Sequence, residues 1–141
     1  GRVVRMLRGV RGVVVDLSPG MLARAREKGL LACCARSEAL PFASGVADAV
    51  IVVDAFHHFS DHSRAAGELL RVLRKGGKLF LEEPDITNLA IKLIALGERL
   101  LLMRSRFYDF ATLVRFFSER GALLLWSERK SGFIRLVFGR R

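Results

Sequence analysis

Carboxylate and imidazole side chains follow four apolar segments of this chain, at the positions where those segments end. The first is Asp16, which follows three valines and precedes Ser18 and Pro19, a pair typical of a helix start. The later groups fall at residues 36–38, 54–58 and 83–85. Residues that follow the strands of a parallel sheet meet at one edge, where ligands bind. An acid placed like Asp16 can accept hydrogen bonds from both hydroxyls of a ribose.

The segments that carry these groups alternate between strand and helix patterns. Apolar runs predict strands over residues 13–16, 30–35, 49–53 and 78–82, and capped or amphipathic segments predict helices over 2–8, 19–29 and 63–73. Gly76 and Gly77 are expected to end the last of these helices. The alternation predicts an α/β fold: a Rossmann-like, doubly wound, mostly parallel sheet with helices on both faces. Helices over 86–103 and 109–120 and strands over 123–129 and 133–138 then predict a C-terminal antiparallel hairpin.

The composition fits one domain over residues 1–141. About half of the residues are hydrophobic (51%), which is enough to bury one core. The net charge is +10, but the basic residues are scattered, so we expect solvated faces and no nucleic-acid partner. The most apolar stretch, 86–103, contains Lys92, Glu98 and Arg99, so it does not predict a transmembrane segment.

The cysteines and histidines show no metal-ligand pattern. Cys33 and Cys34 are adjacent in a predicted strand, so their side chains point to opposite faces and do not pair easily. This favours a reducing, cytoplasmic location. His57, His58 and His62 lack the partners of a CxxC or HExxH set, so we expect no metal.

Four segments, taken in their order and spacing, resemble class I S-adenosylmethionine-dependent methyltransferases. They are DLSPGML (16–22), SEALPF (37–42), DAVIVVDAFHHFSD (48–61) and LLRVLRKGGKLFLEEP (69–84). Within this class, the segments are similar to methyltransferase type 11, the group that includes the ubiquinone and menaquinone biosynthesis methyltransferases. The resemblance implies S-adenosyl-L-methionine as the cofactor.

The resemblance also implies a role for most of the strand-end residues. Asp16 would accept from the ribose hydroxyls, and Met21 would rest near the adenine. The backbone of residues 37–38 would contact the adenine edge, and residues 54–56 would line the floor beneath the methionine part. The implied cofactor set is Gly1, Asp16, Leu17, Met21, Ser37, Glu38, Asp54, Ala55 and Phe56.

Methyl transfer from a sulfonium depends mainly on close in-line approach of the acceptor. A base is useful where the acceptor is a hydroxyl, an amine or an acidic carbon, and the candidates are Asp54, His57 and His58. The alternative is that the two histidines only cap or pack at the strand end. The acids at 82, 83 and 85 are interpreted as solvated turn charges, and the LPF segment (40–42) as loop packing.

Two departures from the family pattern affect this assignment. Arg36 stands where relatives often place an Asp that accepts from the adenine amino group, so that contact is left to the backbone or to Glu38. Relatives also have a strand and a GxGxG loop upstream, and Gly1 resembles the last glycine of that loop. We therefore expect an N-terminally truncated domain. Either the strands over 13–16 and 49–53 close the resulting gap, or a partner chain fills it in a homodimer, or residues precede Gly1.

The leading prediction is an enzyme that methylates a small acceptor. In relatives the region 86–120 is a helical cap over the site, and its apolar residues imply an apolar acceptor such as a quinone; ordinary core or a dimer face is the alternative. Three other functions stay open: a non-catalytic scaffold or regulatory subunit, a nicotinamide-dependent dehydrogenase, and a nucleic-acid methyltransferase. The LPF and VLRKGG segments favour methyl transfer over the dehydrogenase, and an NPPY-like segment for nucleic-acid methylation is absent.

Overall fold

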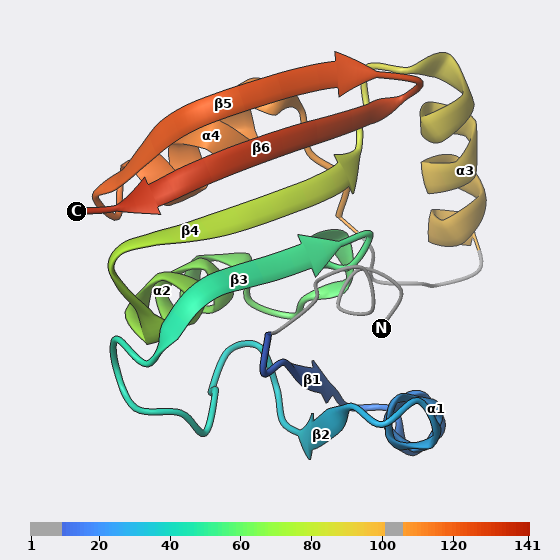
Figure 1. The fold of residues 1–141 in the computed structure, drawn as a ribbon. Coiled ribbons are helices and arrows are strands. Elements are labelled where there is room, and N and C mark those ends of the chain that lie inside the picture. Colours follow the sequence, from blue (N-terminus) through green and yellow to red (C-terminus); the bar gives the residue numbers. More distant parts are fainter. Residues whose placement is uncertain (1–9, 101–105) are drawn as a thin grey trace.

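The structure is a computed structural model that describes residues 10–100 and 106–141, in which strands and helices alternate (Figure 1). A small sheet contains β1 (Val13–Asp16) and β2 (Leu31–Cys34), and α1 (Pro19–Glu27) packs beside it. The larger sheet has the spatial order β3 (Ala47–Val53), β4 (Leu73–Pro84), β6 (Phe133–Arg140), β5 (Ala122–Lys130). Further helices are α2 (His62–Val72), α3 (Leu89–Leu100) and α4 (Phe110–Ser118), and a 3₁₀ turn covers Phe56–His58.

The strand directions confirm the predicted α/β fold with its closing hairpin. β1 is parallel to β2 and β3 to β4, whereas β6 is antiparallel to both β4 and β5. Ser131 and Gly132 join β5 to β6 with positive φ angles of 54° and 79°. Positive φ at both positions is what a two-residue hairpin turn needs to match the twist of its strands. Local turn chemistry therefore fixes the hairpin.

β4 begins earlier than the sequence pattern predicts. α2 ends at Val72 and the strand starts at Leu73, so the prediction that the glycines close the helix is wrong. Ala47 pairs with Leu73 but Ala49 pairs with Lys78, which means that residues 74–77 bulge out of the ladder. A Cβ on Gly77 would lie 2.9 Å from the carbonyl oxygen of Arg74. Glycine occurs both at helix ends and in β-bulges, and at residue 77 the tight bulge is what requires it.

The two sheets are separate in the described part of the chain. There β1 pairs with β2 alone and β3 with β4 alone, so the alternative in which the strands over 13–16 and 49–53 close the gap does not hold for these residues. Val13 on β1 and Val53 on β3 are 43% and 36% exposed. The predicted helix over 2–8 and the role of Gly1 lie outside the described residues.

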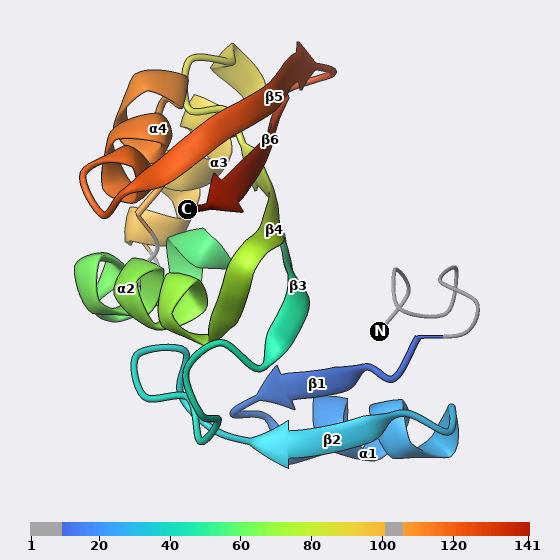
Figure 2. The ribbon, with the colours of Figure 1, turned by 60° about the vertical axis from the view of Figure 1, so that its left-hand side comes forward.

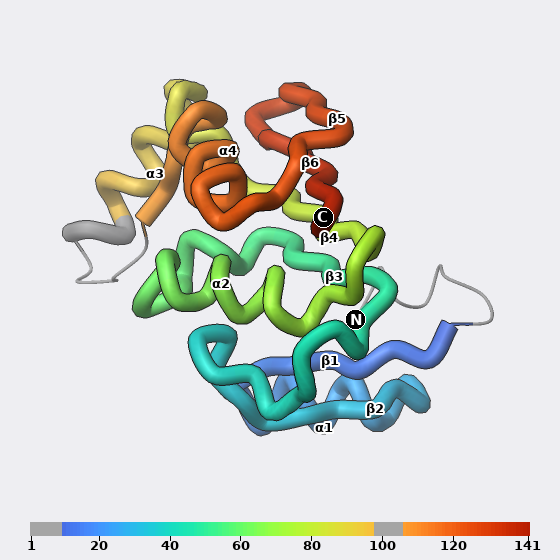
Figure 3. Tube along the Cα trace, turned by 90° about the vertical axis from the view of Figure 1, so that its left-hand side faces the viewer, coloured from blue at the N-terminus to red at the C-terminus, as the bar shows by residue number. Residues whose placement is uncertain are grey.

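α2 and α4 lie on the same side of the larger sheet and cover its apolar face (Figures 2 and 3). Every second residue of β4 and β6 points toward these helices, as the pleat of a strand requires. The fully buried residues of this face are Leu79, Leu81, Ile134, Leu136 and Phe138. α4 contributes Leu113 and Phe117 to the same core. This core holds the carboxyl ends of β3 and β4 in place.

α3 presents apolar side chains outward. Leu89, Leu93, Ile94 and Leu96 are each more than half exposed. α3 and α4 both fall within the predicted cap over 86–120, and the role of that region stays a prediction. Within the described ranges, no helix combines the length and the apolar character needed to cross a membrane.

Candidate functional site

The predicted site residues lie where the parallel strands end. At the end of the β1–β2 pair, the Ala35 N–H donates to the carbonyl oxygen of Asp16 at 3.3 Å. At the end of the β3–β4 pair, the Asp54 N–H donates to the carbonyl oxygen of Glu82 at 2.8 Å. The groups that follow each strand are thus held next to one another within each pair.

Asp16 is partly exposed, and its backbone position is fixed by the start of α1. Its Oδ1 accepts from the Ser18 N–H at 2.8 Å, and the Ser18 hydroxyl in turn caps the helix by accepting from the Met21 N–H at 3.4 Å. Leu17 and Met21, which follow Asp16 in the sequence, are 58% and 48% exposed. A carboxylate followed by two accessible apolar side chains suits a ligand that combines a diol with an aromatic base.

Glu38, in the loop after β2, is hydrogen-bonded to the loop that starts α2. The residue is buried, and its Oε1 accepts from the backbone N–H groups of Ser60 and Asp61 at 2.8 and 3.1 Å. The Ser37 hydroxyl donates to Oε2 at 3.2 Å. Burial alone would raise the pKa of this carboxyl, but hydrogen bonds from the backbone N–H groups of Asp61, Glu38 and Ser60 lower it below its usual value. Because the Glu38 carboxylate is engaged in this way, an adenine contact from this segment is left to its backbone.

The turn after β3 starts with a left-handed residue. Asp54 is exposed and has a φ of 50°, a conformation that aspartate tolerates better than most residues. The next two N–H groups, of Ala55 and Phe56, both donate to Oε1 of Glu83 at 3.0 and 2.7 Å. The Phe56 side chain is fully buried in the core. The predicted role of Phe56 in a cofactor floor is therefore limited to its backbone.

The two adjacent histidines have different surroundings. His57 is buried, its Nδ1 lies 2.6 Å from Oε2 of Glu83, and Phe107 stacks on its ring with centroids 4.6 Å apart. His58 is exposed, and its ring centroid is 3.9 Å from that of His57. The predicted pair thus consists of a histidine fixed by a carboxylate and a second one that reaches solvent.

The interpretation of the acids at 83 and 85 as solvated turn charges is wrong, since Glu83 and Asp85 are 3% and 5% exposed. Oδ2 of Asp85 accepts from Arg129 at 2.7 Å, and its Oδ1 accepts from the Thr87 N–H and hydroxyl. The signal that sequence reasoning missed is the strand period of two. Leu79, Leu81 and Glu83 alternate along β4, so Glu83 falls on the same buried face as the two leucines.

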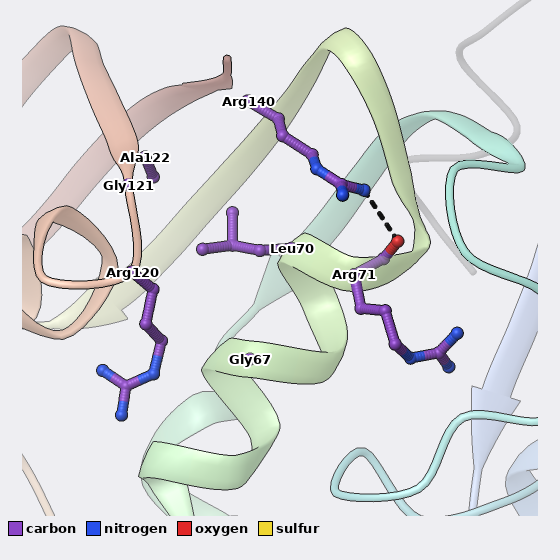
Figure 4. A pocket seen from close by; sticks show the side chains of 7 residues that line it. All are labelled: Gly67, Leu70, Arg71, Arg120, Gly121, Ala122 and Arg140. Carbon is purple, nitrogen blue, oxygen red and sulfur yellow. Dashed lines mark hydrogen bonds between the residues drawn. The ribbon is translucent and has the colours of Figure 1, made fainter.

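A hollow of about 240 Å³ lies at the other end of the larger sheet, where β4 starts and β6 ends (Figure 4). The guanidinium of Arg140 donates there to the backbone carbonyl groups of Arg71 and Leu73. Arg120 donates to the Phe116 carbonyl, and the Arg71 side chain turns away toward Glu68. The lining residues are Gly67, Leu70, Arg71, Arg120, Gly121, Ala122 and Arg140. None of the predicted site residues is among them, and the arginines are engaged, so this hollow is packing around a helix end.

His62 is expected to make the stability of the fold depend on pH. It is buried among Phe56, Tyr108 and Phe116, and its Nε2 has no hydrogen-bond partner among the described residues. Burial, and then the charge of Arg106, lower the pKa of this imidazole, while interactions with the backbone of His57 and Phe56 and then the charge of Glu83 oppose them. The unfolded chain binds the proton near pH 6.5 and the folded chain only at lower pH, so the free energy of unfolding should decrease as the pH falls below about 6.5.

Urea unfolding of the wild-type chain and of His62→Phe between pH 5 and 8 measures this dependence. The phenylalanine variant should lose most of the slope, because an apolar ring has no proton to bind. The matched change His58→Phe, at an exposed position, should keep the wild-type slope. Equal slopes in the wild-type chain and His62→Phe would contradict the assignment.

Comparisons with known proteins agree on one family. Residues 1–81 match the family model for a methyltransferase domain. A demethylmenaquinone methyltransferase of Thermus thermophilus is 42% identical over 81 residues, which cover 53% of this chain and 37% of that protein. A mitochondrial 2-methoxy-6-polyprenyl-1,4-benzoquinol methylase of Leishmania donovani is 37% identical over 90 residues, covering 59% of this chain and 31% of that protein. The chain therefore spans about a third of the length of these relatives.

The solved structures support the fold over most of the chain. A structure of an S-adenosylmethionine-dependent methyltransferase from Thermotoga maritima, described as a possible histamine N-methyltransferase, superposes with a TM-score of 0.82 and 18% identity. The superposition covers 92% of this chain and 72% of that one. At this identity the likeness shows the fold alone, and it confirms the predicted Rossmann-like class.

Proposed function

Because this chain belongs to the methyltransferase-domain family, we propose that it transfers a methyl group from S-adenosylmethionine to a small acceptor. The observation that carries the proposal is the carboxylate of Asp16 at the end of β1. It is partly exposed and is held by the start of α1, and the accessible side chains of Leu17 and Met21 follow it within five residues. This combination of groups fits the ribose and adenine of the cofactor.

The strand-end residues have separate roles in binding the cofactor and in accepting a proton. Asp16 accepts from the two ribose hydroxyls, and Leu17 and Met21 give apolar cover to the adenine. The exposed carboxylate of Asp54, in the left-handed turn after β3, favours a positively charged ligand beside it. The cofactor, when bound, supplies a methyl group on a positively charged sulfur. His57 and His58 follow in the same turn and are available to take a proton from an acceptor that has one to lose.

We propose a quinone-like acceptor with an apolar part. The relatives in Thermus and Leishmania are named for demethylmenaquinone and a polyprenyl benzoquinol. The outward apolar side chains of α3, Leu89, Leu93, Ile94 and Leu96, supply a surface that an apolar acceptor can contact. An apolar contact of this kind contributes to binding in proportion to the area removed from water.

Calorimetry with S-adenosylhomocysteine tests the cofactor part of the proposal. We expect one molecule to bind per chain, and NADH, the control ligand for a dehydrogenase, not to bind. The same titration is made with the full product of the gene that encodes this chain. Failure of both proteins to bind S-adenosylhomocysteine would overturn the proposal.

Transfer of a labelled methyl group from S-adenosylmethionine to a demethylated quinol tests the acceptor. Incorporation into the quinol, and not into a histamine control, is the expected result. Cofactor binding without transfer to any acceptor tried would instead favour the alternative of a non-catalytic scaffold or regulatory subunit.

A further inference from the structure

Glu83 accepts four hydrogen bonds from one turn of the chain. Its Oε1 accepts from the backbone N–H groups of Ala55 and Phe56. Its Oε2 accepts from the backbone N–H of His57 at 3.2 Å and lies 2.6 Å from Nδ1 of the same residue. Glu83 and His57 are only 3% and 4% exposed. A carboxylate is costly to bury unless such partners surround it, so the turn and the carboxylate depend on each other.

The carboxylate also determines which nitrogen of His57 carries a proton. An ionised carboxylate can only accept, so Nδ1, 2.6 Å from Oε2, has to be the donor. A neutral imidazole has one proton, and Nε2 is then left with a lone pair. Two residues far along the chain also hold His57 in place. Phe107 stacks on its ring, and the His57 backbone carbonyl accepts from the Arg106 N–H at 2.8 Å.

We propose that Glu83 is a positioning residue of the methyl-transfer site, which holds the neutral His57 imidazole with its proton on Nδ1 so that Nε2 can accept a proton from the methyl acceptor. The source of that proton rests on the proposed function, whereas the tautomer does not. The O–H or C–H bond of the acceptor breaks, and its proton forms a bond to Nε2 directly or through one water molecule.

The electron pair of that broken bond stays on the acceptor atom, which uses it to bond the methyl carbon. The imidazolium formed at His57 lies beside the Glu83 carboxylate, which stabilises its positive charge. The proton then leaves Nε2 for water and restores the neutral ring. No oxidant or further reactant is needed.

NMR of the wild-type chain with ¹⁵N-labelled histidine tests the tautomer without any need for activity. His58→Gln and His62→Gln identify the signals of His57 by elimination, because the chain has three histidines. In the pH range where the ring is neutral, we expect Nδ1 to be protonated and Nε2 not. A proton on Nε2, or a ring that stays doubly protonated up to about pH 9, well above the usual histidine range, would overturn the proposal.

Glu83→Gln replaces the acceptor that faces Nδ1 of His57 with a donor. The amide oxygen can still accept from Ala55 and Phe56. The NH₂ group that replaces Oε2 loses the weak bond from the His57 N–H, donates to Nδ1 and moves the ring proton to Nε2. We expect the tautomer to invert and kcat for methyl transfer to fall by about 100-fold or more. The affinity for S-adenosylhomocysteine should change little.

Glu82→Gln is the matched control, since it makes the same change at the next residue. Glu82 pairs with Arg135 at 2.5 Å, whereas the described partner of the His57 ring is Glu83, so both the tautomer and kcat should stay as in the wild-type chain. A Glu83→Gln variant that keeps the proton on Nδ1 and full kcat would overturn the proposal.

The two proposals fail in different ways. If the wild-type protein neither binds S-adenosylhomocysteine nor transfers methyl, the proposed function fails, and NMR still decides the tautomer. If methyl transfer occurs while His57 carries its proton on Nε2, only the role of Glu83 is lost.

Discussion

Replacing Asp16 with alanine is expected to weaken the binding of S-adenosylhomocysteine by about 100-fold. A hydrogen bond to a charged group contributes about 1.5–3 kcal/mol, and the carboxylate of Asp16 would accept two from the ribose. The loss of both therefore corresponds to roughly 3 kcal/mol or more, and each 1.4 kcal/mol is a factor of ten. Isothermal titration calorimetry at one pH and ionic strength measures the change.

Asp48→Ala is the matched control for this variant. It removes the same charge, but from a side chain that is 84% exposed, pairs with Arg74, and lies near the start of β3, away from the strand ends. We expect its affinity to equal that of the wild-type chain. Asp16→Asn should fall between the wild-type chain and Asp16→Ala, because an amide oxygen accepts but carries no charge. Equal affinities for Asp16→Ala and Asp48→Ala would show that Asp16 does not hold the ribose.

The position of Asp16 could be predicted because its determinants are local. Three valines favour a strand, and Ser18 and Pro19 start a helix at the residues where the structure has the N-cap and the first helical position. The hairpin is predictable for the same reason, since Ser131 and Gly132 supply the two positive φ angles themselves. In both cases the residues that decide the structure are within a few positions of one another.

The engaged carboxylates could not be predicted in this way. Glu38 accepts from Ser60 and Asp61, which are 22 and 23 residues away, and Glu83 accepts from a turn 26 to 28 residues away. A run of acids before a proline resembles an exposed turn as long as its long-range partners are unknown. The period of β4 is the one local signal, because it places Glu83 in line with Leu79 and Leu81.

The difference between His57 and His58 also depends on distant residues. They are neighbours in sequence, and both follow the same strand. His57 is buried because Glu83 and Phe107 lie around its ring, whereas His58 is exposed. The sequence could identify the pair as a candidate, and tertiary structure decides which member has a fixed tautomer.

Replacing Phe56 with alanine is expected to lower the free energy of unfolding by about 3–5 kcal/mol. The side chain is fully buried, and its ring lies 5.1 to 5.9 Å from those of His62, Phe59, Phe117 and Phe116, measured between centroids. Its removal loses these contacts and leaves a cavity that the surrounding rings fill only in part. Domains of this size are stable by roughly 5–15 kcal/mol, so the loss is a large share of the total. Urea unfolding followed by circular dichroism measures it.

Trp126→Ala is the control for the loss of a large aromatic side chain. Trp126 is 47% exposed, so its removal should cost less than half as much as Phe56→Ala. Phe56→Leu separates the core from the cofactor site, because it keeps most of the buried volume. Since the Phe56 side chain points into the core, Phe56→Leu should bind S-adenosylhomocysteine as tightly as the wild-type chain does. A folded Phe56→Leu variant that no longer binds would contradict this separation of the buried ring from the cofactor site.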